Sequence, residues 1–196
     1  MTKTEARKLA KACRAAVNLH TVGHAMAGVL FALPAWQHAD TVLAFASMPD
    51  EPDTADILRQ ALAEGKRLLL PRVRSRTEMD WVEITALSQL QPGAYGILEA
   101  PASLPAFDTA HLGDGALALI PCLAASPDGV RLGRGGGYYD RFLAHYKGRR
   151  LLVCPTAALL GDLPCEGWDV RFSPHEILTE KGILPVSYTH LTLPTN

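Results

Sequence analysis

Short apolar runs alternate with helix-patterned segments along this chain, and this alternation restricts the fold more than any other feature. An apolar run at 41–46 is followed by a helical pattern at 54–64 and by a second apolar run at 67–70. Asp53 precedes the helical pattern as a candidate cap, and Gly65 follows it as a stop signal. Such a strand, helix, strand unit joins parallel strands, which are buried on both faces.

A second unit of this kind lies in the C-terminal half of the chain. Its strands are expected at 116–120 and 151–154, and its helix at 138–146, after a glycine-rich segment. We therefore expect an α/β fold, a three-layer α/β/α sandwich with a central, mostly parallel sheet of the Rossmann-like type.

The remaining elements carry weaker signals. Thr2 stands three residues before Glu5, the spacing of a capping box, and predicts an N-terminal amphipathic helix. A second helix is expected at 22–33, a further strand at 81–84, and a turn-rich connector at 91–101.

Length and charge narrow the class of protein. With 196 residues and a net charge of −1, the chain suits one domain, expected at 1–185, followed by an appended tail at 186–196. The balanced charge argues against nonspecific nucleic-acid or acidic-membrane binding, and no apolar run reaches the roughly 18 residues of a membrane span. Four cysteines without a CxxC pair indicate reduced thiols, and the basic first residues lack the apolar stretch of a signal peptide. We expect a cytoplasmic protein.

The densest chemical signal is the glycine-rich run RLGRGGGYYDR at 131–141. It lies between an apolar strand and a helix, where α/β proteins bind anions. Its glycines allow N–H groups to approach phosphate oxygens, and Arg131, Arg134 and Arg141 add positive charge. The run is neither a Walker A loop nor a complete GxGxxG motif. We interpret it as a phosphate-binding loop, and the alternative is a surface loop whose glycines serve only a tight turn.

Other polar residues allow more than one interpretation. Asp140 could hold Mg²⁺ bridged to nucleotide oxygens, or could be a first-turn acid stabilised by the helix dipole. His20 and His24 have metal-ligand spacing but no third ligand, so we predict no metal site there. Three arginines that alternate along 72–76 fit an exposed strand edge better than a site for the carboxylates of an anionic ligand. No nucleophilic triad is indicated by spacing.

The glycine-rich run also resembles a known family. Together with Ile120-Pro121 and the string at 129–133, the run at 135–143 closely resembles the signature of the 5-formyltetrahydrofolate cyclo-ligases, also called methenyltetrahydrofolate synthetases. The resemblance covers about residues 3–184 and implies the cyclo-ligase type of Rossmann-like fold. Further segments that match in family order lie at 45–54, 65–71, 79–80, 96–99 and 163–180.

The resemblance implies a ligase that uses MgATP to close 5-formyltetrahydrofolate into 5,10-methenyltetrahydrofolate, with release of ADP and phosphate. Transfer of the γ-phosphoryl group to the formyl oxygen would turn that oxygen into a leaving group, and the neighbouring folate amine would then attack. The implied cofactors are ATP and Mg²⁺. The implied partner is a small-molecule folate, with or without a polyglutamate tail, bound by a monomer that has no nucleic-acid or membrane partner.

The resemblance also implies roles for single residues. Arg134 and Tyr138 are the expected catalytic residues, and Asp140 and Asp169 the expected Mg²⁺ ligands. The expected substrate-binding residues are Ala46, Glu51, Arg134, Gly135, Gly136, Gly137 and Tyr138. The expected ATP-binding residues are Lys3, Arg7, Arg131, Leu132, Gly133, Arg134, Gly135, Gly136, Gly137, Tyr138 and Tyr139.

Plainer interpretations stay open for four of these residues. Lys3 and Arg7 could belong to a solvated basic helix face, because further lysines lie nearby. Glu51 could be an ordinary loop acid, and Ala46 could serve only core packing.

The chain departs from the family pattern at two positions. Trp168 stands where the family usually has histidine, and Ala158 stands where it usually has glutamine. Two rival functions stay open, the first because of these departures and the second because a glycine-rich loop on such a fold could bind a substrate phosphate. One is a non-catalytic reduced-folate-binding member of the family, and the other is a sugar-phosphate-binding enzyme of similar fold.

Overall fold

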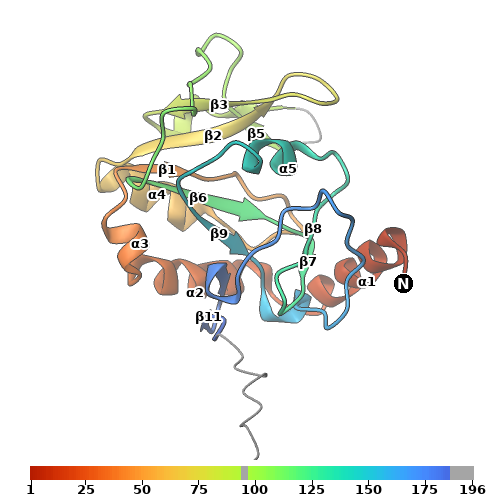
Figure 1. Cartoon of the computed structure of the whole chain (residues 1–196). Coiled ribbons are helices and arrows are strands. Elements are labelled where there is room, and N and C mark those ends of the chain that lie inside the picture. The colour runs from red at the N-terminus through yellow and green to blue at the C-terminus, as the bar shows by residue number, and fades with distance from the viewer. Residues whose placement is uncertain (94–96, 186–196) are drawn as a thin grey trace, which may run out of the picture.

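A central seven-stranded sheet organises the molecule (Figure 1). The computed structural model describes residues 1–93 and 97–185, so Gly96 and the expected tail at 186–196 lie outside the described residues. The five inner strands run parallel, and the edge strands β11 and β3 are antiparallel to their neighbours. The mostly parallel α/β sheet is therefore confirmed. From edge to edge the strands are β11 (Gly182–Ile183), β10 (Ile177–Thr179), β9 (Arg149–Val153), β6 (Ala116–Pro121), β1 (Thr41–Leu43), β2 (Arg67–Val73) and β3 (Met79–Ile84).

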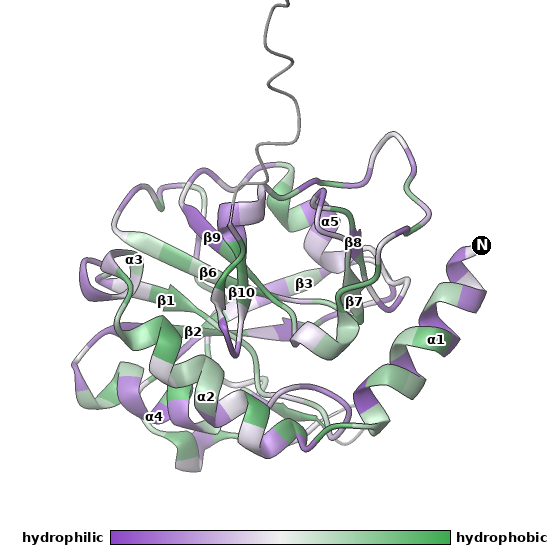
Figure 2. Ribbon diagram, turned by 90° about the horizontal axis from the view of Figure 1, so that it is seen from below, coloured by the Kyte–Doolittle hydropathy of each residue, from purple (hydrophilic) through white to green (hydrophobic). Residues whose placement is uncertain are grey.

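Helices cover both faces of this sheet. Figure 2 shows α2 (Leu19–Phe31) and α4 (Ala55–Ala63) together on one side, where they contribute buried residues such as Leu30 and Ile57 to one core cluster. The opposite face is covered by α5 (Tyr138–Leu143) and by the loops around it, which form a second core cluster. Alternate residues of each strand point to opposite faces, so each of the five inner strands contributes to both clusters.

Two further helices lie at the margins. The short α3 (Pro34–Gln37) follows α2, while α1 (Lys3–Ala15) packs against η3 (Thr156–Ala158) and a small hairpin. Figure 2 shows α1 beside the sheet, near that hairpin. This location places its basic face next to the glycine-rich segment.

Local capping sets where the first helices begin. Thr2 Oγ1 accepts a hydrogen bond from the Glu5 N–H at 3.2 Å, and the Glu5 carboxylate accepts one from the Thr2 N–H at 2.7 Å, which confirms the capping box. The second helix begins earlier than expected, because Asn18 caps it by accepting from the Thr21 N–H. The N-cap position of α4 is Thr54, one residue after the expected Asp53, but the Thr54 side chain makes no capping hydrogen bond. The Asp53 carboxylate instead accepts from the Ala55 N–H at 2.8 Å, so Asp53 supplies the cap as expected.

Several sequence-based boundaries differ from the structure. The helix expected at 138–146 ends at Leu143. The connector at 91–101 contains β4 (Gln91–Pro92) and β5 (Leu98–Glu99), which pair as a hairpin. Another hairpin, β7 (Ala124–Ala125) and β8 (Arg131–Leu132), separates β6 from the glycine-rich turn. Two-residue strands carry no periodic signal, since a period of two needs several residues to be seen.

The sheet order determines where a site can form. β1 pairs in parallel with β2 on one side and with β6 on the other, so the chain leaves β1 and β6 in opposite directions. Ligands of open α/β sheets bind outside the carboxyl ends of the strands at such a switch point. The segment after β1 and the segment after β6 therefore flank the expected site.

The sequence also makes predictions about the cysteines and about helices long enough to span a membrane. All four cysteines have free thiols, as expected. Across residues 1–93 and 97–185, no helix combines the length and the apolarity needed to cross a membrane.

Candidate functional site

The turn of the glycine-rich segment depends on left-handed backbone at two positions. Gly135 has φ +99° and Gly137, the N-cap of α5, has φ +67°. A Cβ at Gly135 would lie 3.2 Å from a guanidinium nitrogen of Arg7. Residues with side chains rarely adopt these conformations, so glycine is favoured here by the backbone.

Arg131 ties this segment to the sheet and to α5. Its guanidinium is nearly buried, donates to the Pro121 carbonyl at 3.1 Å and lies 2.8 Å from the Asp140 carboxylate. Its buried Nε–H has no hydrogen-bond partner among the described residues. Arg131 therefore fixes the position of Asp140 at the start of α5.

A cleft of about 480 Å³ opens beside these residues. It unites residues from α1, the glycine-rich segment and the loop at 166–169, which are far apart in sequence. Arg7 donates from Nε to the Gly133 carbonyl at 3.1 Å, which holds α1 against the glycine-rich segment. The predicted residues that line the cleft are Lys3, Arg7, Arg131, Leu132, Gly133, Gly135, Gly137, Asp140 and Asp169.

Lys3 and Asp169 form an ion pair in the wall of this cleft. Lys3 Nζ lies 2.9 Å from Asp169 Oδ2 and 2.8 Å from Glu166 Oε2. Burial by itself would raise the pKa of Asp169, but hydrogen bonds from the Glu166 N–H and from Lys3 outweigh burial and lower it. Asp169 is therefore a carboxylate at neutral pH.

A second charged group lies at the switch point. Arg134 Nη2 lies 3.0 Å from Glu51 Oε1 and also contacts Asp50. Glu51 is buried, and its other oxygen accepts a hydrogen bond from the Met48 N–H at 2.9 Å. The segments after β1 and β6 thus meet through their charged side chains, as the sheet order requires.

Arg14 is a residue that the sequence analysis missed. It is almost completely buried and donates to the carbonyl groups of Cys122, Leu123 and Asp50, so it links the segments after β1 and β6 from beneath. A signal was present, because Arg14 lies seven residues after Arg7, two helical turns along the same helix face.

Six predicted residues lie outside the cleft lining, namely Glu51 and Arg134 at the switch point and four others. Tyr138 donates from its hydroxyl to the Ser75 carbonyl at 2.9 Å and faces a second cavity. Tyr139 is partly buried, with its ring edge-on against Trp81, and burial of its hydroxyl raises the pKa of that group. Ala46 packs against the core on the α2 face, and Gly136 adjoins the ring of Tyr138.

The two aspartates of the cleft fit a Mg²⁺ ion that is also bound by substrate phosphates better than an ion bound by the protein alone. Within the described part of the chain, no three His, Cys, Asp or Glu side chains are grouped to hold a metal. Asp140 and Asp169, however, line the same cleft, and Mg²⁺ commonly uses one or two carboxylates with substrate phosphates and water. His20 and His24 pair separately with Asp53 and Asp56.

A family comparison decides how this geometry is interpreted. The model of the 5-formyltetrahydrofolate cyclo-ligase family matches residues 2–180. The chain belongs to that family. It is thus a member of a family of ligases, and the resemblance found in the glycine-rich run is confirmed.

Individual relatives agree with this assignment. The 5-formyltetrahydrofolate cyclo-ligase of Mycolicibacterium smegmatis is 30% identical over 151 residues, which cover 74% of this chain and 76% of the relative. The Escherichia coli enzyme of the same name is 32% identical over 137 residues, covering 67% of this chain and 74% of the relative.

Solved structures show the same fold. The Aquifex aeolicus 5,10-methenyltetrahydrofolate synthetase covers 100% of this chain and 98% of its own, with a TM-score of 0.80 and 25% identity. A Mycoplasma pneumoniae 5,10-methenyltetrahydrofolate synthetase has a TM-score of 0.70 at 21% identity, covers 92% of this chain and 99% of its own, and supports the fold alone.

The two departures from the family pattern lie in different environments. Ala158 is fully buried in the core cluster under α5. Trp168 lines the cleft and is 75% exposed, which is unusual for so large an apolar side chain.

Proposed function

We propose that this cyclo-ligase family member converts 5-formyltetrahydrofolate and ATP into 5,10-methenyltetrahydrofolate, ADP and phosphate. One observation carries the proposal. The positively charged cleft and the Glu51–Arg134 pair lie next to each other at the carboxyl ends of the parallel strands. Lys3, Arg7 and Arg131 supply positive charge in the cleft, and the buried Glu51 with Arg134 lies at the neighbouring switch point.

The cationic cleft is the proposed nucleotide site. Arginine and lysine side chains together with backbone N–H groups of a left-handed glycine turn are the usual partners of phosphate oxygens. Residues 131–139 are the proposed ATP-binding segment. Within it, Tyr139 would contribute indirectly, by packing against Trp81. Asp140 and Asp169 would hold Mg²⁺, which when bound neutralises phosphate charge.

Glu51 is the proposed anchor for the pterin. An ionised carboxylate accepts up to about four hydrogen bonds, and Glu51 uses one oxygen for the Met48 N–H and the other for Arg134. Capacity therefore remains for the paired donors of an amino-pyrimidine edge. This anchor would place the formyl group close to Arg134.

Arg134 and Tyr138 are the proposed residues at the reacting group. The formyl oxygen takes the γ-phosphoryl group of ATP, the neighbouring folate amine attacks the formyl carbon, and phosphate leaves with that oxygen. Negative charge develops around the oxygen and phosphoryl group that react. A guanidinium that is already held in place beside them stabilises this charge in the transition state. We further propose that the enzyme is a cytoplasmic monomer that uses free folates, with or without a polyglutamate tail, and has no nucleic-acid or membrane partner.

The test is formation of the methenyl product, followed by its ultraviolet absorbance. Purified protein is incubated with 5-formyltetrahydrofolate, with and without MgATP, beside Asp140→Ala and a matched change at the exposed Asp114. We expect product that requires ATP and Asp140 and tolerates Asp114→Ala. Saturable folate binding without product would instead indicate a non-catalytic binding protein, the rival that Trp168 and Ala158 raise. Absence of both binding and turnover would point to a sugar-phosphate-binding enzyme.

A further inference from the structure

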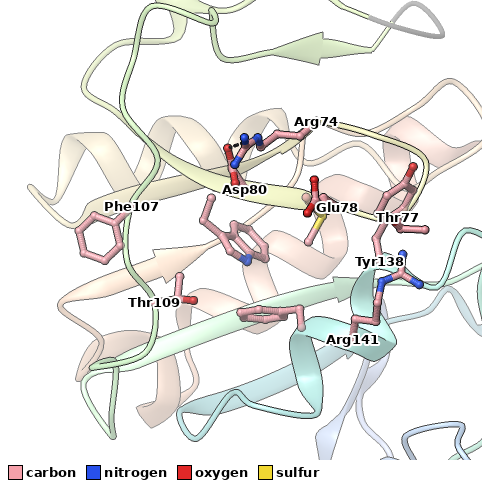
Figure 3. Close-up of a pocket in the computed structure, with 11 residues that line it drawn as sticks. Arg74, Thr77, Glu78, Asp80, Phe107, Thr109, Tyr138 and Arg141 are labelled. Carbon is pink, nitrogen blue, oxygen red and sulfur yellow. Dashed lines mark ion pairs between the residues drawn. The ribbon is translucent and has the colours of Figure 1, made fainter.

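A second cavity lies between β3 and α5. Its volume is about 360 Å³, within the range of small-molecule sites, and it shares only Arg141 with the lining of the nucleotide cleft. Figure 3 shows Phe107 and Thr109 on one side of this cavity, and Tyr138 and Arg141 on the other. The cavity therefore adjoins the glycine-rich segment and shares Tyr138 with the proposed active site, while most of its lining lies outside the nucleotide cleft.

The wall of this cavity contains an unpaired buried donor. Trp81 lines the cavity and is only 3% exposed, and its Nε1–H is buried with no hydrogen-bond partner among the described residues. Trp36 gives the contrast, because it is equally buried yet donates from Nε1 to Glu64 Oε2 at 3.1 Å. Buried indole N–H groups ordinarily find an acceptor, so the Trp81 donor is suited to an acceptor on a ligand.

The surroundings of Trp81 are aromatic and rigidly held. The ring of Phe142 lies 5.0 Å from the Trp81 ring between centroids, tilted by 56°. On the other side, the Phe107 N–H donates to the Trp81 carbonyl at 2.7 Å, which fixes that segment against β3. Aromatic walls held in this way favour a planar ring through offset or edge contacts.

The rim of the cavity has one cation without a carboxylate partner. Arg74 lies 3.5 Å from Asp80, as Figure 3 shows by a dashed line. Arg141, by contrast, forms no ion pair with any described carboxylate. Its guanidinium lies over the Tyr138 ring and donates to the Gly136 carbonyl at 2.8 Å. Such a cation attracts a negatively charged group.

We propose that this cavity binds a small aromatic carboxylate or carboxamide. The ring lies among the aromatic walls, a ligand oxygen accepts from Trp81 Nε1–H, and Arg141 favours the negative charge. Two sources offer this chemistry, namely the benzoyl-amide and glutamate arm of the folate substrate and a free aromatic acid. Only the first source rests on the proposed function.

Indole resonances in a ¹H–¹⁵N spectrum test the proposal directly. The chain has three tryptophans, so three indole N–H signals are expected, and Trp81→Phe identifies one of them. The probes are benzoate, 4-aminobenzoyl-glutamate and the non-aromatic cyclohexanecarboxylate. We expect the first two to move the Trp81 signal saturably while the Trp36 signal stays in place. Trp81→Phe weakens probe binding about tenfold, the ratio expected for one lost hydrogen bond, and Trp36→Phe leaves it unchanged.

A second variant keeps the test decisive if Trp81→Phe does not fold. Arg141→Gln should weaken benzoate binding several-fold while benzamide binding stays within twofold of wild type. An unmoved Trp81 signal, equal binding of cyclohexanecarboxylate, or unchanged affinity in both variants would overturn the proposal.

Competition separates the two sources. Displacement of 4-aminobenzoyl-glutamate by 5-formyltetrahydrofolate supports the substrate arm, and simultaneous binding supports a separate aromatic acid. Turnover by the wild-type enzyme is measured independently, so failure of the proposed function is distinguishable from failure of this site.

Discussion

The guanidinium of Arg134 lies 3.0 Å from Oε1 of Glu51, although 83 positions separate these residues in sequence. The contact exists because β1 and β6 are parallel neighbours whose carboxyl ends lie at the same edge of the sheet. It joins the proposed pterin anchor to the proposed phosphoryl-transfer residue.

Arg134→Ala should lower kcat/KM by about 10²–10³-fold, because it removes a fixed charge from the reacting oxygen. Glu51→Gln should act mainly through a higher KM for the folate. Arg59→Ala, which removes an exposed arginine paired with Asp56 on α4, is the matched control and should leave kinetics unchanged. Wild-type kinetics in Arg134→Ala would contradict the assignment.

Asp140→Asn and Asp169→Asn should each reduce the rate by about 100-fold or more and raise the Mg²⁺ concentration needed for half-maximal rate. The two variants should differ in stability. Asp140→Asn weakens the ion pair of the nearly buried Arg131 and should cost about 1–3 kcal/mol of unfolding free energy. Rates titrated with Mg²⁺ and urea unfolding check both effects. An unchanged Mg²⁺ requirement in both variants would exclude them as ligands.

Trp168→Ala should raise KM for ATP several-fold, because an exposed indole at the cleft can stack on the purine ring. Inorganic tripolyphosphate lacks a base, so its inhibition constant should not change. Trp168→Phe should retain most of the ATP affinity. Equal loss of affinity for ATP and tripolyphosphate would refute a stacking role.

Asp50 should contribute to the acid sensitivity of the fold. Burial alone would raise the pKa of Asp50, but the hydrogen bond and charge of Arg134 outweigh burial and lower it. A carboxyl whose pKa is lower in the folded state adds stability above its unfolded pKa of about 3.9, and this stability is lost as pH falls through the folded value. Asp50→Asn should therefore be less stable at pH 7 and show a shallower decline below about pH 4.

Urea midpoints between pH 7 and pH 3 check the Asp50 prediction. Asp114→Asn serves as the exposed control and should follow the wild-type profile. A variant profile parallel to wild type throughout would show that Asp50 contributes nothing to the acid transition.

Gly129→Ala should destabilise the fold by roughly 3 kcal/mol or more. Gly129 has φ +89°, and a Cβ there would lie only 1.6 Å from the Phe172 carbonyl oxygen, a backbone atom that cannot move aside. Gly28→Ala is the matched change, since nothing lies within 4 Å of its Cβ position inside α2, and it should stabilise by up to about 1 kcal/mol. Thermal or urea unfolding of both variants checks the contrast.

The sequence by itself determined what depends on neighbouring residues. The Thr2 and Glu5 capping box, the apolar run that becomes β6 and the left-handed turn at Gly135 were all visible, because caps, periodicity and glycine turns act within a few positions. The glycine-rich run, an uninterrupted string of this local kind, was enough to identify the family.

Only the tertiary structure decided which distant segments meet. The pairing of Glu51 with Arg134, the burial of Arg14 and the unpaired indole of Trp81 each depend on the order of strands in the sheet. Strand order is set by the burial of two apolar faces at once, an energy summed over the whole chain, so no window of a few residues contains it. For this reason the sequence was sufficient to predict the chemistry of the loop, whereas the contacts of Arg7 and Glu51 with that loop became visible only in the fold.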